Sequence, residues 1–405
     1  MRFIALFATL VAEAIVLRPA PFQLTDHFIF VTAGRLVLEG RSPYDPAAWA
    51  DAAQRFDSPH IATMIATTGA VWSYPPWTAY LFAPFGALPP VAAAWAFHLS
   101  DLAVGIVGLA LLARSFPWRH ERTAALALAL GAAFQPFVIG VRWGQFGGLL
   151  ILGLALLIHG LGSSGRARVP ALVTGALLLA AKPHVVTVLG VVVLAILISR
   201  RAWRDLVAIA APLAVIGGVT TALYPEWTDI AGFGYRTRVE EFARYASTYS
   251  LAFDLSANAW PVVAGILIVL ASGACAVAWL LAPSDFRLHA GLAGAATVSL
   301  TIVPYLYPYD HVTLLPALFL AVAVAQHAST GRVLQLGAAF AIGLLVPWAA
   351  FFVSSARPTQ ATSAWVPLLM SGLILASVIL ARTNRRPSLG EEAAQAAASA
   401  TPRSA

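Results

Sequence analysis

The sequence predicts an all-α protein that crosses a membrane many times, with about twelve transmembrane helices. Of its 405 residues, 60% are hydrophobic and only 11% are charged, whereas charged residues make up about a quarter of an ordinary soluble domain. Unbroken apolar runs also recur along the whole chain, separated by Arg, Pro and Gly clusters. Since about 20 apolar residues span a bilayer, these runs leave no room for a separate soluble catalytic domain.

Twelve apolar runs are expected to form helices. They lie near residues 3–17, 91–113, 123–140, 146–162, 169–181, 185–199, 205–223, 260–282, 289–303, 311–328, 333–353 and 364–381. The first run resembles a signal peptide, with Ala20 near a possible cleavage site. We expect it to be retained, because Glu13 interrupts it and the alternation of the loops requires this helix.

Arginine placement predicts the orientation, because short cytoplasmic loops are enriched in Lys and Arg. The arginines of one set of loops are Arg114, Arg119, Arg122, Arg166, Arg168, Arg200, Arg201, Arg204, Arg287, Arg332, Arg382, Arg385 and Arg386. That set, together with Arg2, places both termini of a plasma-membrane protein in the cytoplasm. The long loops 18–90 and 224–259 then lie outside, and residues 1–382 form one membrane domain. The tail 383–405, rich in Ala, Ser and Pro, is expected to be disordered.

The net charge of +7 does not indicate a nucleic-acid partner. The 25 Lys and Arg residues are spread through interhelical loops and are not gathered on one face. The one cysteine, Cys275, excludes an intrachain disulfide and a thiolate metal cluster.

The first outer loop is expected to be structured. Asp26 to Gly40 is amphipathic, so its apolar residues could lie along the membrane surface while Arg35 and Glu39 stay in water. The segment from Tyr74 to Pro90 is too short to span and is bounded by prolines. It is therefore expected to be a re-entrant or interfacial segment buried against protein.

Polar groups gather at the predicted outer ends of the helices, while the inner ends hold little except arginines. Several unrelated helices delivering acid, base and cation to one level indicate a site there. The outer groups include Asp26, His27, Arg142, Gln145, Lys182, His184, Arg236, Arg238, Asp310 and His311.

Lys182 is the only lysine of the chain. It ends an apolar helix on the outer side, against the positive-inside trend, and a proline follows it. A compact ammonium at a helix break suits a phosphate or pyrophosphate. The alternative is a lysine that extends to the outer headgroups.

Three outer aspartates have simpler structural interpretations. Asp26 directly precedes an apolar-periodic run and could be an N-cap. Asp45 fits a turn, and Asp310 stands at another outer helix start, where a cap is again expected.

Within the predicted spans, His98 and Asp101 lie three residues apart on one helical face. They could form a proton relay, although a structural hydrogen bond to a neighbouring helix explains them as well. No HExxH, EF-hand or zinc-finger spacing, Walker loop or GxGxxG occurs, so we expect no metal and no cofactor.

The order of these motifs resembles glycosyltransferase family 87, which consists of polytopic GT-C enzymes including polyprenyl-phosphate-mannose-dependent α-mannosyltransferases. The resemblance rests on Asp26, on Gly40-Arg41-Ser42-Pro43-Tyr44-Asp45, on Trp72-Ser73-Tyr74-Pro75-Pro76, on Gly144-Gln145, on Lys182-Pro183 and on the late Tyr-Pro-Tyr-Asp-His. It covers about residues 1–380. The sequence departs from the family after Gln145, where an Asn is common, and at His311, where a Trp and a second His are common.

The resemblance implies a GT-C-type fold and the roles of particular residues. Asp26 corresponds to the essential acid of the first outer loop, and Lys182, with His184, Arg142 and His311, would bind the donor phosphate. The substrate pocket would include His27, Tyr44, Tyr74, Gln145 and Asp310.

The expected activity is an inverting transfer of a hexose, mannose above all, from a polyprenyl-phosphate sugar to a lipid or glycan acceptor at the outer membrane face. Two alternatives remain open. A twelve-helix secondary transporter shares the plan of both termini inside, and a polyprenyl-linked envelope polymerase or ligase shares the lipid phosphate chemistry.

Overall fold

The computed structural model describes residues 22–56, 58–68, 72–228, 245–326, 331–356 and 359–383. Within these ranges all regular structure is helical, which agrees with the predicted fold class. The short helices that open the chain are η1 (Phe22–Leu24), α2 (His27–Leu38), α3 (Pro46–Phe56), α4 (Pro59–Thr68), α5 (Pro76–Leu81) and α6 (Ala83–Gly86).

The helices of the remaining chain mostly match the runs expected from the sequence to within a few residues. They are α7 (Pro90–Arg114), α8 (Glu121–Ala132), α9 (Gln135–Trp143), α10 (Gly147–Gly162), α11 (Arg168–Ala180), η2 (Pro183–Val186), α12 (Thr187–Ser199), α13 (Trp203–Leu223), α16 (Thr248–Leu255), α17 (Trp260–Leu281), α18 (Ser284–Ile302), η3 (Pro308–Leu314), α19 (Leu315–Ala325), α20 (Arg332–Phe340), η4 (Ala341–Leu345), α21 (Val346–Ser355), η5 (Ala361–Ala364) and α22 (Trp365–Thr383).

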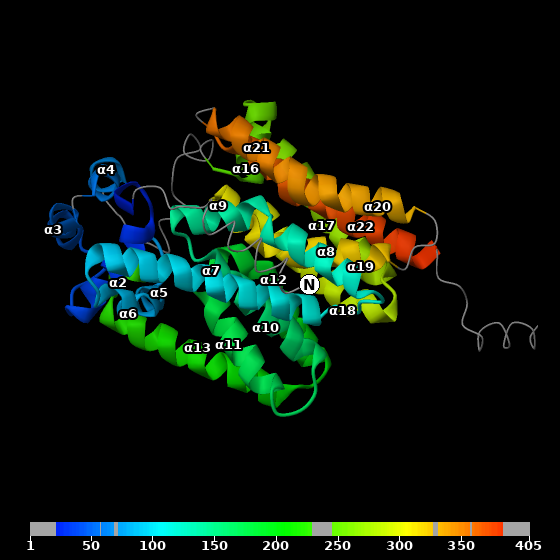
Figure 1. Cartoon of the computed structure of the whole chain (residues 1–405), viewed down its shortest axis with the longest axis horizontal. Coiled ribbons are helices and arrows are strands. Elements are labelled where there is room, and N and C mark those ends of the chain that lie inside the picture. Colours follow the sequence, from blue (N-terminus) through cyan, green and yellow to red (C-terminus); the bar gives the residue numbers. More distant parts are fainter. Residues whose placement is uncertain are drawn as a thin grey trace, which may run out of the picture.

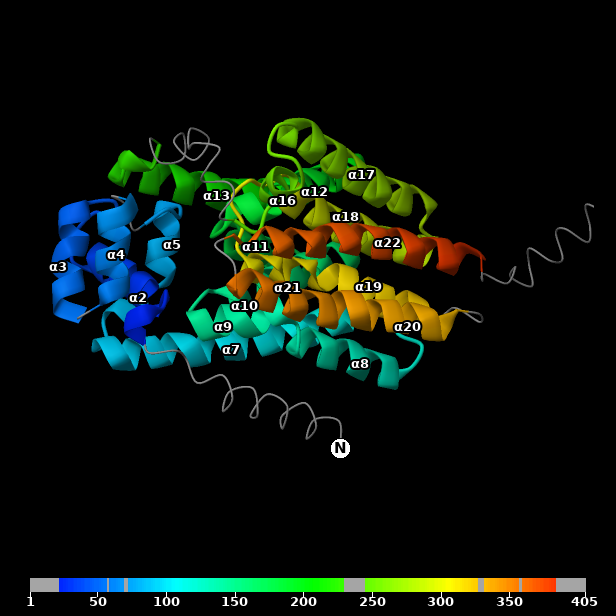
Figure 2. The ribbon, with the colours of Figure 1, turned by 90° about the horizontal axis from the view of Figure 1, so that it is seen from above.

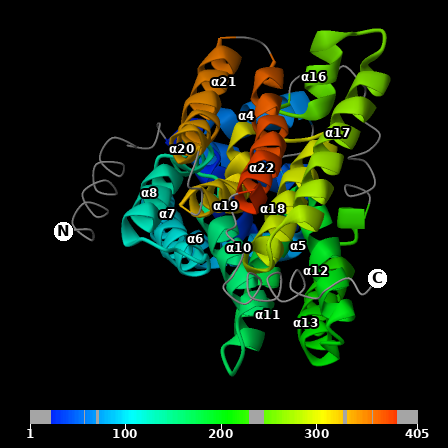
Figure 3. The same ribbon diagram turned by 90° about the vertical axis from the view of Figure 1, so that its right-hand side faces the viewer.

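The long helices form an elongated bundle, and α2 to α6 gather at one of its ends (Figures 1 and 2). Figure 3 looks along the bundle from the opposite end, with these short helices behind the long ones. Neighbouring long helices pack closely against one another, as α7 does with α10 and α10 with α11.

Helix α19 lies at the centre of the bundle. Every residue from Leu315 to Ala325 is buried, because the segment is apolar on all sides and α8, α18, α20 and α22 surround it. Helix α13 is the opposite case, since only Asp205 and Thr220 of its residues are buried. Its exposed apolar surface is what a lipid-facing helix requires.

Six helices among the described residues are long and apolar enough to cross a membrane, or seven if α8 and α9 count as one bent span. The protein is therefore a multi-pass membrane protein, but the expected number of twelve spans is not confirmed. Several predicted spans form helices of only 13 to 16 residues, as in α10, α11 and α12. The expected helix 123–140 is broken near Pro136, with a bend of 42°, because proline cannot continue the hydrogen-bond ladder.

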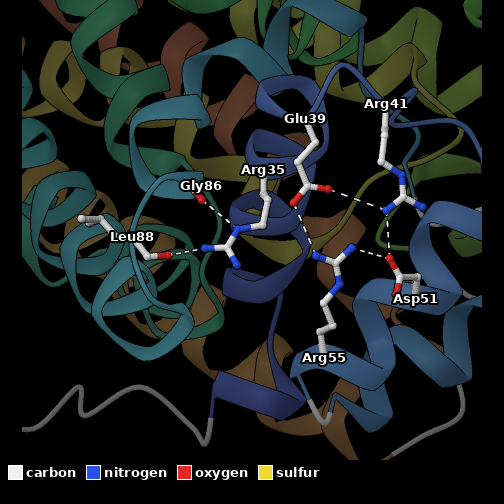
Figure 4. Close-up of polar contacts among 7 residues, drawn as sticks. All are labelled: Arg35, Glu39, Arg41, Asp51, Arg55, Gly86 and Leu88. Carbon is white, nitrogen blue, oxygen red and sulfur yellow. Dashed lines mark hydrogen bonds and ion pairs between the residues drawn. The ribbon is translucent and has the colours of Figure 1, made fainter.

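Helix α2 forms where the amphipathic stretch was expected, but the prediction that it lies along the membrane surface is wrong. Ten of its twelve residues are buried, because α5, α6 and α7 pack against it. The segment from Tyr74 to Pro90 folds as α5 and α6, but its expected burial is only partial: Thr78, Ala79 and Phe82 are buried, whereas Tyr80, Leu81 and Leu88 are exposed. Arg35 joins the two parts: its Nε donates to the Gly86 carbonyl at 2.9 Å (Figure 4).

Exposed ion pairs join the end of α2 to α3 (Figure 4). Arg41 lies 2.9 Å from Asp51, and Arg55 contacts both Asp51 and Glu39. Because these side chains are largely solvated, the pairs orient α3 more than they stabilise the fold.

The two ends of the bundle differ in chemistry. At the end away from α2, Arg168 pairs with Asp205 at 2.7 Å, and Arg200 donates to the Leu161 carbonyl at 2.9 Å. The helix ends near Arg114, Arg287, Arg332 and Arg382 lie at this same end of the alternating bundle. The orientation-predicting arginines that lie within the described residues thus share one end.

Three expectations fall outside the described residues. These are the first helix at 3–17, most of the outer loop between 229 and 244, and the tail from 384 onward.

Candidate active site

Asp26 stands at the N-cap position of α2, yet its side chain makes no capping hydrogen bond. Its two carboxylate oxygens instead accept hydrogen bonds from distant parts of the chain. Oδ1 lies 2.9 Å from Nε2 of His60, and Oδ2 accepts from the Gln145 side-chain amide. The cap interpretation therefore fails, and a partly exposed carboxylate is held by two side chains.

Gln145 connects Asp26 to the basic part of the site. Its Oε1 accepts from Lys182 Nζ at 3.3 Å and from the Tyr74 hydroxyl at 3.4 Å, while its Nε2 donates to Asp26. The reverse amide orientation would place an NH₂ group against an ammonium and an oxygen against a carboxylate. The charges on either side thus fix the orientation of the amide.

A glycine turn places Gln145. Helix α9 ends at Trp143, and Gly144 takes a left-handed conformation with φ of +76°, which glycine adopts without steric cost. The Asp26 backbone N–H donates to the Trp143 carbonyl at 3.0 Å. This bond joins the start of α2 to the α9–α10 turn, so that Asp26 and Gln145 meet.

Lys182 lies where α11 ends and Pro183 begins a new helical turn. Its ammonium forms an ion pair with Asp310, and the two side chains are only 4% and 1% exposed. The rings of Tyr309, Tyr74 and Phe146 lie 4.9, 5.5 and 5.6 Å from Nζ, at distances typical of cation–π contacts. A lysine this buried does not reach the headgroups.

Asp310 serves both as a cap and as a charge partner. Oδ2 accepts from the Tyr307 backbone N–H at 2.9 Å, which closes the capping box of η3. Oδ1 faces Lys182. The expected cap is present, and it leaves one oxygen to neutralise the buried ammonium.

Tyr74 lies between the two carboxylates. Burial raises the pKa of its phenol well above the usual value, and the charges of Asp26 and Asp310 raise it further. The hydroxyl therefore stays protonated and acts as a hydrogen-bond donor.

A narrow recess borders this chain of side chains, with essentially no free space for a water-sized molecule. It is lined by Gln145, Phe146, Gly147, Leu150, Lys182, Tyr309 and Asp310. It thus joins the break before α10 to the break after α11 and to the start of η3.

The other basic residues expected at the site lie at different distances from this chain. His184 lies within electrostatic range of both Lys182 and Asp310. His311 is buried next to Asp310, and its Nε2 has no hydrogen-bond partner among the described residues. Arg142 is exposed at the C-terminal end of α9, and none of the hydrogen bonds or ion pairs of the described residues joins it to Lys182 or Asp310.

His27 and Tyr44 are not part of the chain that joins Asp26 to Asp310. His27 is fully buried, with Nδ1 2.8 Å from the Thr25 hydroxyl and Nε2 3.3 Å from His98. Burial lowers the pKa of His27 to about 3, with a smaller effect from His98, so the imidazole is neutral. The Tyr44 hydroxyl donates to the Tyr74 carbonyl at 2.7 Å and so helps to hold the backbone at Tyr74 in place.

Asp101 has a structural role rather than a place in a relay. Its Oδ1 accepts from the Leu149 backbone N–H at 3.3 Å, in the first turn of α10. His98 contacts His27 and the Val141 carbonyl, so the two side chains face different partners. Asp101 thus satisfies a helix N-terminus that has no cap of its own.

Sequence reasoning missed His60 and did not single out Phe146 and Tyr309. His60 lies 34 residues from Asp26 and belongs to no periodic motif. The only available signal was a histidine at the start of an apolar segment in the outer loop. Within the described ranges, no cluster of three or more His, Cys, Asp or Glu side chains is arranged to hold a metal ion.

Comparisons with known proteins identify the family. No functionally curated protein matches the sequence. The crystal structure of ArnT from Cupriavidus metallidurans bound to undecaprenyl phosphate matches with 15% identity and a TM-score of 0.45, covering 99% of this chain and 81% of that one. ArnT from the same organism in the apo state matches with 16% identity and a TM-score of 0.46, covering 95% and 78%.

The profile of glycosyltransferase family 87 matches residues 72–306, which is more than half of the chain. The match includes Tyr74, Gln145 and Lys182, while Asp26, His60 and Asp310 lie outside it. The expected family is thereby confirmed, and the chain belongs to glycosyltransferase family 87.

Proposed function

We propose that the protein transfers a hexose, with mannose as the first sugar to test, from a polyprenyl-phosphate donor to a hydroxyl of a lipid or glycan acceptor. The transfer occurs at the outer membrane face and inverts the anomeric configuration. One observation carries the proposal. Asp26 is joined through Gln145 to Lys182 and Asp310, so that a candidate base and a buried cation lie at the same end of the bundle.

Asp26 is suited to act as the general base. Each carboxylate oxygen accepts one hydrogen bond, from His60 or from Gln145, and a carboxylate oxygen can accept two. Asp26 therefore keeps capacity to accept the proton of an acceptor hydroxyl as that oxygen attacks the sugar. A single base on one side of the sugar fits inversion, with an oxocarbenium-like transition state.

Lys182 and its neighbours are suited to the leaving phosphate. A phosphate needs positive charge to stabilise its developing negative charge, but it needs no acid to protonate it. Two N–H donors of Lys182 face Asp310 and Gln145, which leaves the third for a phosphate oxygen.

The arginine distribution supports the outer face. Arg168 and Arg200 make their contacts at the end of the bundle opposite Asp26, and the positive-inside rule assigns the arginine-rich end to the cytoplasm. A lipid-linked donor is the sugar donor expected where cytoplasmic nucleotide sugars do not reach.

The test is sugar transfer by the purified protein in nanodiscs. Polyprenyl-phosphate mannose and a membrane lipid extract are supplied, and release of polyprenyl phosphate is measured by mass spectrometry. We expect release that depends on the extract, and no reaction when a nucleotide-linked mannose replaces the lipid donor. Turnover with the nucleotide sugar alone, or none with any polyprenyl-phosphate hexose, would refute the proposed donor class.

A further inference from the structure

His60 approaches Asp26 from an element that contributes nothing else to the site. Its Nε2 lies 2.9 Å from Asp26 Oδ1, on the oxygen that Gln145 leaves free. Because a carboxylate oxygen only accepts, Nε2 must carry the proton and donate it. Two donors on two oxygens fix the plane of the carboxylate, which a single donor would allow to rotate.

The position of His60 is itself fixed by packing. Its neighbours Ser58 and Ile61 are buried, and the Ile61 N–H donates to Ser58 Oγ at 3.4 Å at the start of α4. Helix α4 packs against η1, the turn that leads directly into Asp26. The His60 side chain itself is 29% exposed, and its Nε2 faces Asp26.

We propose that His60 is a positioning residue for the transfer reaction: its Nε2–H holds the Asp26 carboxylate in the orientation from which Asp26 accepts the proton of the acceptor hydroxyl. This inference rests on the proposed function. A base must be held close to its productive geometry, and loss of that orientation lowers the rate of the chemical step more than substrate binding.

Two neutral substitutions separate this role from a structural one. In His60→Gln the side-chain amide nitrogen reaches about as far as Nε2, whereas in His60→Asn it reaches only about as far as Nδ1. We expect His60→Asn to lower kcat by about 10- to 100-fold, the effect of one hydrogen bond to a charged group, with KM for the donor changed less than about twofold. His60→Gln should keep kcat within about fivefold of wild type.

The matched control is His120→Gln. His120 is exposed and directly precedes α8, and its hydrogen bond to Gln326 comes from the backbone N–H. It should match wild type. Equal loss in His60→Gln and His60→Asn, full activity in both, or a change confined to KM would each overturn the positioning role.

A readout independent of activity separates failure of this inference from failure of the proposed function. His60→Asn should lower the Tm of the protein in nanodiscs, and the same change should have no effect in an Asp26→Ala background, because the partner is already absent. Equal Tm effects in both backgrounds would show that His60 does not act through Asp26, even if wild type transferred no sugar from any donor tested.

Discussion

Lys182 illustrates how a single residue combines stability and chemistry in this protein. A buried ammonium without a counter-charge is costly, and Asp310 supplies that charge from η3, while Gln145 accepts a second hydrogen bond. Removing one partner of a buried ion pair leaves the other charge uncompensated, which typically costs about 3–5 kcal/mol. Loss of activity in a single variant at Lys182 would therefore not by itself reveal a catalytic role.

A double substitution separates the two effects. Lys182→Met should reduce both the Tm and sugar transfer, because Asp310 is left as an unpaired buried charge. Adding Asp310→Asn removes that charge and keeps an oxygen for the Tyr307 cap, so the Tm should recover most of its loss. Transfer should stay at least about 100-fold below wild type, the effect of losing one preorganised donor to a developing anion. Recovery of transfer together with the Tm would assign Lys182 a purely structural role.

At the residue scale, the sequence predicted which residues belong to the site better than it predicted the contacts between them. Asp26, Gln145, Lys182 and Asp310 could be proposed from their places at outer helix ends, and the structure brings all four together. Their chemical roles stay predictions. His60 could not be found, because its contact with Asp26 depends on how α4 packs against η1, and no local pattern encodes that packing.

Helix breaks are the elements that build the site. Gln145 follows the glycine turn between α9 and α10, Lys182 lies between α11 and η2, and Asp310 belongs to the 3₁₀ turn before α19. The sequence marks these breaks with Gly144, Pro183 and Pro308, so the break positions were predictable. The burial of α2 was not predictable, because the same apolar face would be expected for a helix that packs against lipid and for one that packs against protein.

The glycine turn before Gln145 provides a test at this scale. A Cβ at position 144 would lie 2.4 Å from His27 Nδ1, whereas a Cβ at position 165 would meet nothing within 4 Å. Both glycines have positive φ, so alanine at either position costs about 1–2 kcal/mol from backbone strain alone. We expect Gly144→Ala to lower the Tm well beyond Gly165→Ala and to reduce transfer. Equal Tm values for the two variants would mean that the turn tolerates the clash.

For the whole molecule, the separation of charge along the bundle decides between the functional alternatives. A transporter places its ionisable groups near the bilayer midplane, whereas Asp26, Lys182 and Asp310 lie together at one end of the bundle, next to the short helices of the first loop. The His98 and Asp101 side chains that a relay would need bond to different partners, the Val141 carbonyl and the Leu149 N–H. These features favour the glycosyltransferase, which is also the family of the chain.

Cysteine labelling tests the proposed orientation of the bundle. The native Cys275 is buried and should give little background. Ala47 in α3 and Ser164 between α10 and α11 are both exposed and belong to opposite ends. In intact cells, a membrane-impermeant thiol reagent should modify Ala47→Cys and not Ser164→Cys, and both should react after permeabilisation. The reverse pattern would place the site in the cytoplasm.

The central claim is that Asp26 is the base of a sugar transfer, and one comparison tests it most directly. Asp26→Asn and Asp45→Asn make the same chemical change in the same loop, but Asp45 is an exposed residue directly before α3 whose Oδ1 accepts from the Ala47 N–H at 2.9 Å. Single-turnover transfer from polyprenyl-phosphate mannose should fall by at least about 100-fold in Asp26→Asn, the usual effect of losing a general base. Asp45→Asn should match wild type, and both variants should keep the wild-type Tm within a few degrees. Full transfer by a folded Asp26→Asn protein would contradict the assignment of the base.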